Sequence, residues 1–222
     1  MRIVAGMPIL NQNARLNNSG TYPFGTLGGI VFDHSTNKTV GITAYHSVWT
    51  EGLQWNTFKN VDIAQKELLD VVTLNEPRNE KIKIGRILKV HFDNKIDTAL
   101  IEFSEAFMDQ IEYTPTESVH FSEMDTRDIL EKKGASTFET KGEFLRYEEN
   151  ETIFYYGLKR VAFQLLIVMN PIGDFQRFSA KGDSGSIIYK EGKAAGLLLG
   201  GNNTVSYGMH AYFIEKKLNI SF

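Results

Sequence analysis

The stretch AKGDSGSII, residues 180–188, determines how the rest of this sequence is interpreted. It places Ser184 between Gly182 and Gly185, directly after Asp183. Ordinary turns select the same residue types, so the stretch alone fits either a polar hairpin or a nucleophile on a tight turn. A nucleophilic serine also needs a base, a group that orients the base, and donors for an oxyanion. The remainder of the chain must therefore be searched for these partners.

Two other segments contain the residue types that a nucleophilic serine needs. His46 ends the β-type run GITAYH, and Asp97 begins the run DTALIEF. The chain order His46, Asp97, Ser184 is one of the orders in which Ser-His-Asp triads occur. Asp93, in the stretch HFDNKID, is the alternative carboxylate, but its neighbours are typical of a turn. The order and residue types favour a hydrolytic triad over three unrelated polar residues.

The composition argues against several other classes of function. The 222 residues include 24 Lys+Arg and 27 Asp+Glu, and there is no basic run that would follow a nucleic acid or an anionic membrane. There is no cysteine, which excludes disulfides, thiolate nucleophiles and thiolate metal sites. The apolar run 161–169 is too short to cross a bilayer, and MRIVAGMPIL is too short and interrupted for a signal peptide. We expect a cytoplasmic protein without nucleic-acid or membrane partners.

Short runs of β-branched and aromatic residues, bounded by Gly, Asn, Asp or Pro, predict an all-β chain. The predicted strands are 28–33, 38–45, 81–90, 97–103, 152–157, 160–169, 185–189 and 194–201. Capping residues and apolar spacing predict helices at 122–134 and 211–220, and residues 62–70 and 104–112 carry less regular helical patterns. Strands thus dominate the expected fold.

The segments TAYH, DTALI and GDSGS resemble the three signature segments of the chymotrypsin-like (trypsin-like) serine peptidases, in their order and at about their spacing. GTLGGIVFD, LEKKGASTFETKGEF and the C-terminal HAYFIEKKLNI extend the resemblance, toward a cysteine-free, bacterial-type branch. It implies two six-stranded antiparallel β-barrels with the active site in the cleft between them, and a short C-terminal helix. Residues 1–115 would form the lobe with His46 and Asp97, and residues 116–222 the connection and the lobe with Ser184.

The resemblance also implies a role for each site residue. Ser184 would be the nucleophile, His46 the general base and acid, and Asp97 the carboxylate that orients the histidine. The amides of Gly182 and Ser184 would form the oxyanion hole, and Asp183 would turn inward to a buried cation or to hydrogen-bond donors. The implied protein is an intracellular serine endopeptidase with a processing, regulatory or defence role. It would act on a protein or peptide substrate without a cofactor or metal, and a protein partner would activate or inhibit it.

The residues implied to bind the substrate depart from the trypsin pattern. Phe178, six residues before the serine, would lie at the base of the primary specificity pocket, where it offers no acid to pair with Arg or Lys. Leu199 stands where the family commonly has a serine that supports the catalytic aspartate. Tryptic specificity is therefore not expected. The implied substrate-binding residues are Phe178, Lys181, Leu199, Gly200, Gly201 and Gly208.

Several alternatives stay open. The chain could be a silent or latent binding module on the same fold, or an esterase with the same triad. RIVAG resembles a zymogen activation junction, in which cleavage between Arg2 and Ile3 would free an amine for Asp183, but we favour a plain first strand. A metal site built on His91 and Asp93 lacks a closely spaced ligand pair, and GLLLGG lacks the ending of a phosphate-binding loop.

Overall fold

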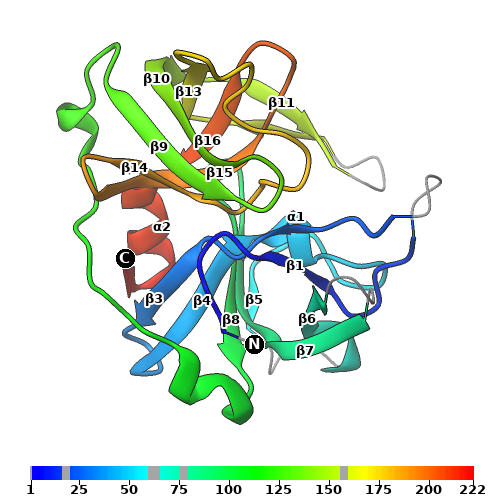
Figure 1. The fold of residues 1–222 in the computed structure, drawn as a ribbon. Helices are drawn as coiled ribbons and strands as arrows, with labels where there is room; N and C mark the ends of the chain where they lie inside the picture. The colour runs from blue at the N-terminus through cyan, green and yellow to red at the C-terminus, as the bar shows by residue number, and fades with distance from the viewer. Residues whose placement is uncertain (1, 17–20, 60–65, 76–79, 156–159) are drawn as a thin grey trace.

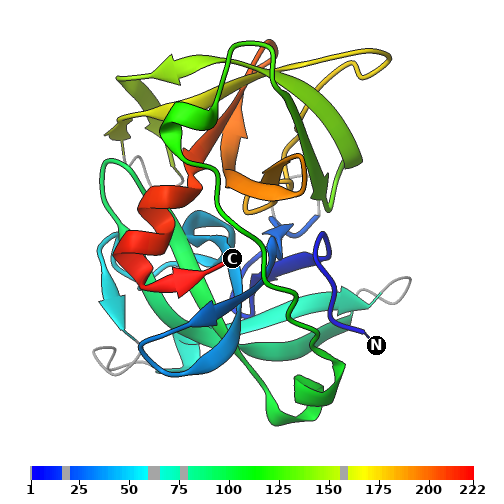
Figure 2. The same ribbon diagram turned by 90° about the vertical axis from the view of Figure 1, so that its left-hand side faces the viewer.

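The computed structural model describes residues 2–16, 21–59, 66–75, 80–155 and 160–222. Figure 1 shows two β units stacked on each other, with the last helix lying at their junction. Figure 2 shows that one long extended segment, residues 111–128, connects the units along one side. Strands far outnumber helices in the described residues, which confirms the all-β prediction.

The N-terminal unit is one curled antiparallel sheet of nine strands, in the order β17-β3-β4-β8-β7-β6-β1-β2, with β5 paired to β7. These strands are β1 Pro8–Asn11, β2 Gly25–Thr26, β3 Gly29–Asp33, β4 Lys38–Ala44, β5 Phe58–Lys59, β6 Asp70–Asn75, β7 Glu80–Phe92, β8 Asp97–Phe103 and β17 Ile220–Ser221. The expected first barrel is confirmed only in part, because the described strands form a curled half-barrel whose edge strands, β17 and β2, do not pair with each other.

The C-terminal unit contains the closed six-stranded barrel that the sequence predicted, in the order β10-β13-β16-β15-β14-β9. Its strands are β9 Ile129–Gly134, β10 Phe138–Glu148, β13 Leu166–Pro171, β14 Ile187–Lys190, β15 Lys193–Gly201 and β16 Ser206–His210. A separate two-stranded hairpin, β11 Glu151–Phe154 and β12 Arg160–Phe163, lies beside this barrel. The division of the chain at residue 115 stays a prediction.

The helix predictions are confirmed only at the C-terminus, where α2 spans Ala211–Leu218. The expected helix at 122–134 is wrong: the short 3-10 turn η4, Phe121–Glu123, is followed by strand β9. Side chains of β9 alternate between exposed and buried, and its pairing with β10 and β14 outweighs the local helical pattern. The segments with less regular helical patterns, 62–70 and 104–112, contain the 3-10 turns η2 Lys66–Leu69 and η3 Glu105–Gln110. Residues 62–65 lie outside the described residues.

Two strand predictions also need correction. The expected strand 160–169 is interrupted between β12 and β13, where Leu165 has a φ of 57° that no strand residue adopts. The segment RIVAG is not the first strand, because β1 begins at Pro8 and Gly6 has a φ of 88°. Ile3 is instead buried in the hydrophobic core.

One continuous apolar cluster holds the two units together and so fixes the position of the surface between them. Val31 and Ile42 of the curled sheet, Leu197 of the barrel, and Ile214 of α2 all belong to this cluster. A second cluster, which includes Phe178, fills the barrel interior. Because protein interiors are close-packed, the shared cluster keeps residues from both units in a constant relative position.

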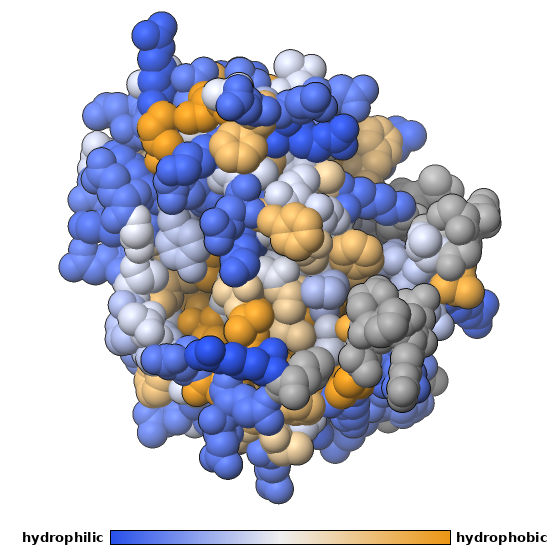
Figure 3. Space-filling model, in the orientation of Figure 1, coloured by the Kyte–Doolittle hydropathy of each residue, from blue (hydrophilic) through white to orange (hydrophobic). Residues whose placement is uncertain are grey.

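Apolar side chains gather near the middle of the face in Figure 3, between the two units, and smaller apolar patches interrupt the polar surface elsewhere. The one-turn helix α1, Tyr45–Val48, lies at this junction and follows directly after β4. None of the described helices is long and apolar enough to cross a membrane.

His210, the N-cap residue of α2, is a buried titratable group. Its Nδ1 accepts the Tyr212 amide at 3.1 Å, and its ring stacks on Phe121 with the centroids 4.0 Å apart. Its Nε2 has no hydrogen-bond partner among the described residues. Burial first, and then the neighbouring His120, lower the pKa of His210 from 6.5 to about 4.

This lowered pKa predicts a loss of stability in mild acid. The unfolded chain takes up a proton at His210 as the pH falls through 6.5, whereas the folded protein resists protonation down to about pH 4. The free energy of unfolding should fall across this window by about 3 kcal/mol. His210→Asn keeps a capping acceptor but cannot titrate, so its stability should vary less between these pH values. Urea unfolding of both proteins measures the difference, and an equal slope for the variant would contradict the assignment.

Candidate active site

His46 and Asp97 are joined by two hydrogen bonds where the two units meet. The His46 Nδ1 lies 2.6 Å from Asp97 Oδ2, and the His46 amide donates to Asp97 Oδ1 at 3.1 Å. Asp97 is fully buried at the start of β8, and the His46 side chain is 21% exposed on α1. Because a carboxylate only accepts, the neutral imidazole carries its proton on Nδ1 and presents Nε2 as an acceptor. This is the tautomer that a general base requires.

Ser184 belongs to a tight turn that closes against the first unit. Its carbonyl accepts the Thr26 amide at 2.8 Å and the Ser47 hydroxyl at 3.2 Å. Its own hydroxyl donates to the carbonyl of Leu199 at 3.1 Å, and the described residues contain no hydrogen bond between this hydroxyl and His46. Ser184 and His46 nevertheless line the same cleft. The hydroxyl must therefore rotate before His46 can accept its proton.

The amides of Gly182 and Ser184 are the expected oxyanion donors. Within the described part of the chain, neither amide donates to a protein acceptor, and both residues line the cleft beside His46. Gly182 has a φ of 103°, a conformation that glycine adopts without strain. Two unpaired amides on one turn can bind an anionic oxygen.

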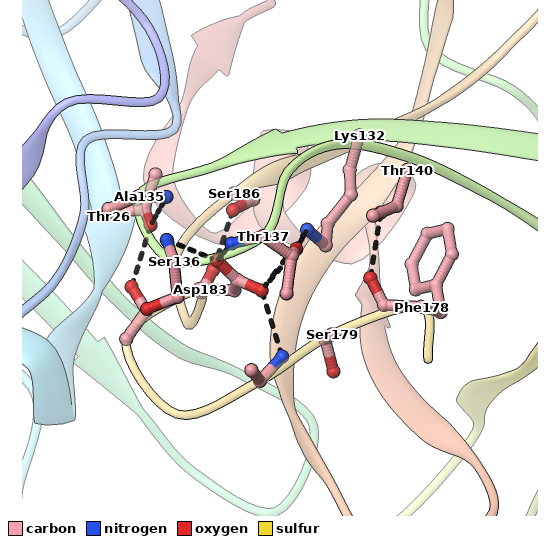
Figure 4. A network of polar contacts seen from close by, with 12 residues as sticks. Thr26, Lys132, Ala135, Ser136, Thr137, Thr140, Phe178, Ser179, Asp183 and Ser186 are labelled. Atoms are coloured by element: carbon pink, nitrogen blue, oxygen red, sulfur yellow. Dashed lines mark hydrogen bonds and ion pairs between the residues drawn. The ribbon is translucent and has the colours of Figure 1, made fainter. Parts of the chain in front are cut away.

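The Asp183 side chain lies within a network of polar contacts that anchors the turn, as Figure 4 shows. Its carboxylate lies 3.2 Å from Lys132 Nζ, and both side chains are fully buried. It also accepts hydrogen bonds from the Thr137 hydroxyl at 2.7 Å and from the amides of Ser136 and Ala180, each at 2.8 Å. Burial raises the pKa of Asp183, but the Lys132 charge and these donors outweigh it and hold the pKa below its ordinary value.

Lys132 is therefore the partner of Asp183, and Ile3 is not among its described partners. Sequence reasoning missed Lys132 because residues 122–134 were interpreted as a helix. The signal was present: in a strand, Leu130, Lys132 and Gly134 share one face, so the lysine points inward with a leucine and a glycine.

Breaking the buried pair should destabilise the protein strongly. Lys132→Met leaves the Asp183 carboxylate buried without its cation, and the free energy of unfolding should fall by about 3–5 kcal/mol. Lys141→Met is the matched control, because the Lys141–Glu131 pair is about half exposed on the same barrel and should contribute little. Urea unfolding monitored by circular dichroism compares the two. A Lys132→Met loss no larger than that of the control would contradict the anchoring role.

A cleft of about 760 Å³ opens in front of Ser184 and His46, a size typical of ligand-binding clefts. Its described lining comes from the turn after β1, the loop before β2, α1 with the residues that follow it, and the turn 181–184. Both units thus contribute to its walls.

The expected substrate-binding residues are divided between this cleft and the interior. Lys181 lines the cleft. Phe178 is 1% exposed, packs against Gly142 in the barrel core, and accepts the Thr140 hydroxyl at its carbonyl. It therefore lies inside the barrel rather than at an open pocket.

The other expected residues lie on β15 and β16. The Leu199 side chain is buried, and its carbonyl accepts the Ser184 hydroxyl. Gly200 borders open space, since a Cβ there would meet no atom within 4 Å, and Gly201 is exposed. Gly208 is buried against Ile188. Only Gly200 and Gly201 of this group offer accessible backbone beside the nucleophile.

Tyr155 is a residue beside the triad that sequence reasoning missed. The centroid of its ring lies 5.4 Å from that of His46, and it packs on Trp55 and Phe92. Its hydroxyl is buried and has no hydrogen bond of ordinary geometry in the described residues. Burial, and then the Asp97 charge, raise the pKa of Tyr155 well above its ordinary value. Tyr155, which follows β11, thus packs beside the His46 ring. No sequence motif marks this contact, because the two residues are far apart in the chain.

Metal ligation has no support in the described residues, where no group of three His, Asp or Glu side chains could hold an ion. His91 Nε2 lies 2.9 Å from Asp93 Oδ2, so these two residues pair with each other. Asp93 also accepts the amides of Lys95 and Ile96, which makes it the turn residue that its sequence indicated.

Comparisons with known proteins bear on the fold. No protein-family model and no curated protein matches the sequence. Among solved structures, Thermobifida fusca Protease A is similar with a TM-score of 0.62 at 16% identity, over 99% of this chain and 97% of that one. Cellulomonas bogoriensis chymotrypsin gives 0.61 at 13% identity, over 100% and 98%. Nocardiopsis protease gives 0.57 at 14% identity, over 99% and 97%.

These structures are bacterial proteases, and the alignments run from one end of the chain to the other. The curled sheet, the closed barrel and the C-terminal helix are therefore all part of the likeness. At these identities the likeness establishes the fold. The chain, which contains no cysteine, has the fold of the chymotrypsin-like serine proteases.

Proposed function

We propose that this protein is a serine endopeptidase that hydrolyses peptide bonds through an acyl-enzyme on Ser184. The observation that carries the proposal is that His46, hydrogen-bonded to the buried Asp97, lines the same cleft as Ser184 and the unpaired amides of the 182–184 turn. These are the groups that acyl transfer by serine requires: a nucleophile, an oriented base and oxyanion donors. We also propose a cytoplasmic setting, which the absence of cysteine favours.

The proposed reaction begins with rotation of the Ser184 hydroxyl from the Leu199 carbonyl toward His46 Nε2. His46 accepts the proton as Ser184 Oγ attacks the peptide carbonyl, and Asp97 stabilises the imidazolium through Nδ1–H. The amides of Gly182 and Ser184 bind the oxyanion. His46 then gives the proton to the leaving amine, and a water molecule hydrolyses the acyl-enzyme by the same steps in reverse.

The proposed specificity is not tryptic. Phe178 is buried in the barrel core, so no acid is available to pair with a substrate Arg or Lys at that position. The accessible backbone of Gly200 and Gly201 suits an extended peptide that adds as an antiparallel strand. An unrestricted peptidase would damage its surroundings, so a protein partner that activates or inhibits the site belongs to the proposal.

The alternative function is a silent or latent binding module, favoured by the Ser184 hydroxyl that points to Leu199 rather than to His46. Incubation of the protein with a proteome-derived peptide library, followed by mass spectrometry of new chain termini, distinguishes the two. New termini with the wild-type protein, and none with Ser184→Ala, are expected for the peptidase. Hydrolysis of 4-nitrophenyl acetate without any peptide cleavage would instead identify an esterase, and neither activity would favour the binding module.

A further inference from the structure

Three hydroxyl groups hold the three consecutive peptide carbonyls that precede the nucleophile. The hydrogen bonds run from Ser136 Oγ to the Lys181 carbonyl at 2.6 Å, from Thr26 Oγ1 to the Gly182 carbonyl at 2.8 Å, and from Ser186 Oγ to the Asp183 carbonyl at 2.6 Å. We call Ser136, Thr26 and Ser186 the hydroxyl clamp. Thr26 and Ser136 approach the turn from distant segments of the chain, whereas Ser186 follows the turn directly (Figure 4).

The orientation of a peptide carbonyl also sets the direction of the amide that follows it. A peptide unit is planar and trans, so its N–H points opposite to its C=O. The carbonyl of Lys181 belongs to the same peptide unit as the Gly182 amide, and the carbonyl of Asp183 to the same unit as the Ser184 amide. Ser136 and Ser186 therefore each act on one of the two amides that face the cleft.

Thr26 acts on the peptide unit between these two. Its hydroxyl accepts the Ala135 amide at 3.0 Å, so its own proton is directed to the Gly182 carbonyl. The amide of the same unit, that of Asp183, donates to the Ala180 carbonyl at 3.0 Å. Thr26 is fully buried, and its backbone amide also binds the Ser184 carbonyl. The middle unit is thus held at both of its polar ends.

The unit between Lys181 and Gly182 depends most on its hydroxyl. Gly182 permits rotations that other residues resist, and Lys181 is exposed to solvent. The Ser136 hydroxyl donates a hydrogen bond to the Lys181 carbonyl at 2.6 Å. Ser136 is itself fixed, because its amide donates to the buried Asp183 carboxylate at 2.8 Å. The Ser136 position therefore links the anchoring of Asp183 to the orientation of the Gly182 amide.

We propose that the hydroxyl clamp orients the oxyanion donors, and that Ser136 is the positioning residue for the Gly182 amide. This inference rests on the proposed function of Ser184. Without the Ser136 hydroxyl, the Lys181–Gly182 unit can rotate and turn a carbonyl toward the place where the oxyanion forms. Removal of an oxyanion donor typically slows catalysis by about 100- to 1,000-fold, and a donor that is misoriented part of the time should cost about 10- to 100-fold.

The test is the rate at which a fluorophosphonate phosphonylates Ser184. In the transition state of this reaction the phosphoryl oxygen gains negative charge in the oxyanion hole. Ser136→Ala should react about 10- to 100-fold more slowly than the wild type. Ser136→Thr, which keeps a hydroxyl, should recover most of the rate. With a peptide ester substrate, kcat of Ser136→Ala should fall while KM stays unchanged, because the hydroxyl acts on the transition state.

Thr73→Val is the matched control for a general loss of stability. Thr73 is a buried residue of the curled sheet, and its hydroxyl also donates to a backbone carbonyl, that of Pro8, at 2.7 Å. The Thr73→Val substitution should lower the free energy of unfolding by about 1 kcal/mol, as Ser136→Ala should. The phosphonylation rate of the Thr73→Val protein should equal that of the wild type. Slow phosphonylation of the Thr73→Val protein would show that the reaction rate responds to stability alone, and this result would overturn the inference.

Phosphonylation of Ser136→Ala at the wild-type rate would also overturn the inference, while leaving the proposed function intact. No reaction of the wild-type protein would instead contradict the proposed function. In that case a crystal structure of Ser136→Ala still decides the role of the clamp. Rotation of the Lys181–Gly182 unit away from its wild-type orientation is the expected result, and an unchanged unit would refute it.

Discussion

Replacing Ser184 with alanine should lower kcat for peptide hydrolysis by about a millionfold, the largest effect that any single substitution in this protein is expected to have. The substitution removes the only atom that can form the acyl-enzyme, and the His46–Asp97 pair then has no hydroxyl to activate. The turn itself should persist, because it is held by the carbonyl of residue 184 and by Asp183, and neither involves the Ser184 hydroxyl. Steady-state hydrolysis of a cleaved peptide, identified from the library, measures the loss.

Ser118→Ala is the matched control for this substitution. The Ser118 hydroxyl donates to Glu215 Oε2 at 2.6 Å, away from the cleft, so its loss should leave kcat unchanged. A Ser184→Ala protein that keeps most of its activity would show that another residue is the nucleophile, or that the hydrolysis comes from a contaminant.

Asp97→Asn should lower kcat by about ten thousandfold without unfolding the protein. The asparagine can still accept the His46 amide, but its NH₂ group would donate to Nδ1 of the ring. The imidazole proton would then move to Nε2, where it prevents acceptance of the Ser184 proton. The effect follows from the 2.6 Å contact between His46 Nδ1 and Asp97 Oδ2 and from the complete burial of the carboxylate.

Asp93→Asn is the matched control, since Asp93 is the alternative carboxylate and also hydrogen-bonds a histidine, His91. We expect the Asp93→Asn protein to keep the kcat of the wild type. The pre-steady-state rate of acyl-enzyme formation, measured with a 4-nitrophenyl ester, separates the chemical step from product release. If acyl-enzyme formation slowed greatly in Asp93→Asn and only slightly in Asp97→Asn, the assignment of the two aspartates would be reversed.

Local sequence patterns predicted nine of the 17 described strands: β3, β4, β7, β8, β11, β12, β13, β14 and β15. The run DTALIEF coincides with β8, because a continuous β-branched and apolar run between turn residues has few other solutions. The pairing of His46 with Asp97 was likewise expected from the resemblance: His46 lies on α1 directly after strand β4, and Asp97 begins strand β8. The C-terminal helix carried a regular apolar spacing and formed as expected.

Contacts between distant segments could not be predicted in the same way. In the described residues the first unit is a curled half-barrel sheet, and one of its edge strands is β17, Ile220–Ser221, far along the chain from its partner β3. The anchor of Asp183 depends on Lys132, which lies inward only because β9 is a strand. The hydroxyl clamp is built from residues 26, 136 and 186, whose residue types are those of any turn.

The intact mass of the protein after reaction with a fluorophosphonate shows whether Ser184 and His46 form a working hydrolase site. Wild type, Ser184→Ala and His46→Ala are treated in parallel. The account predicts one adduct on the wild type and none on either variant, because phosphonylation needs both the nucleophile and its base. An adduct of equal yield on Ser184→Ala, or no adduct on the wild type, would contradict an assembled serine hydrolase site.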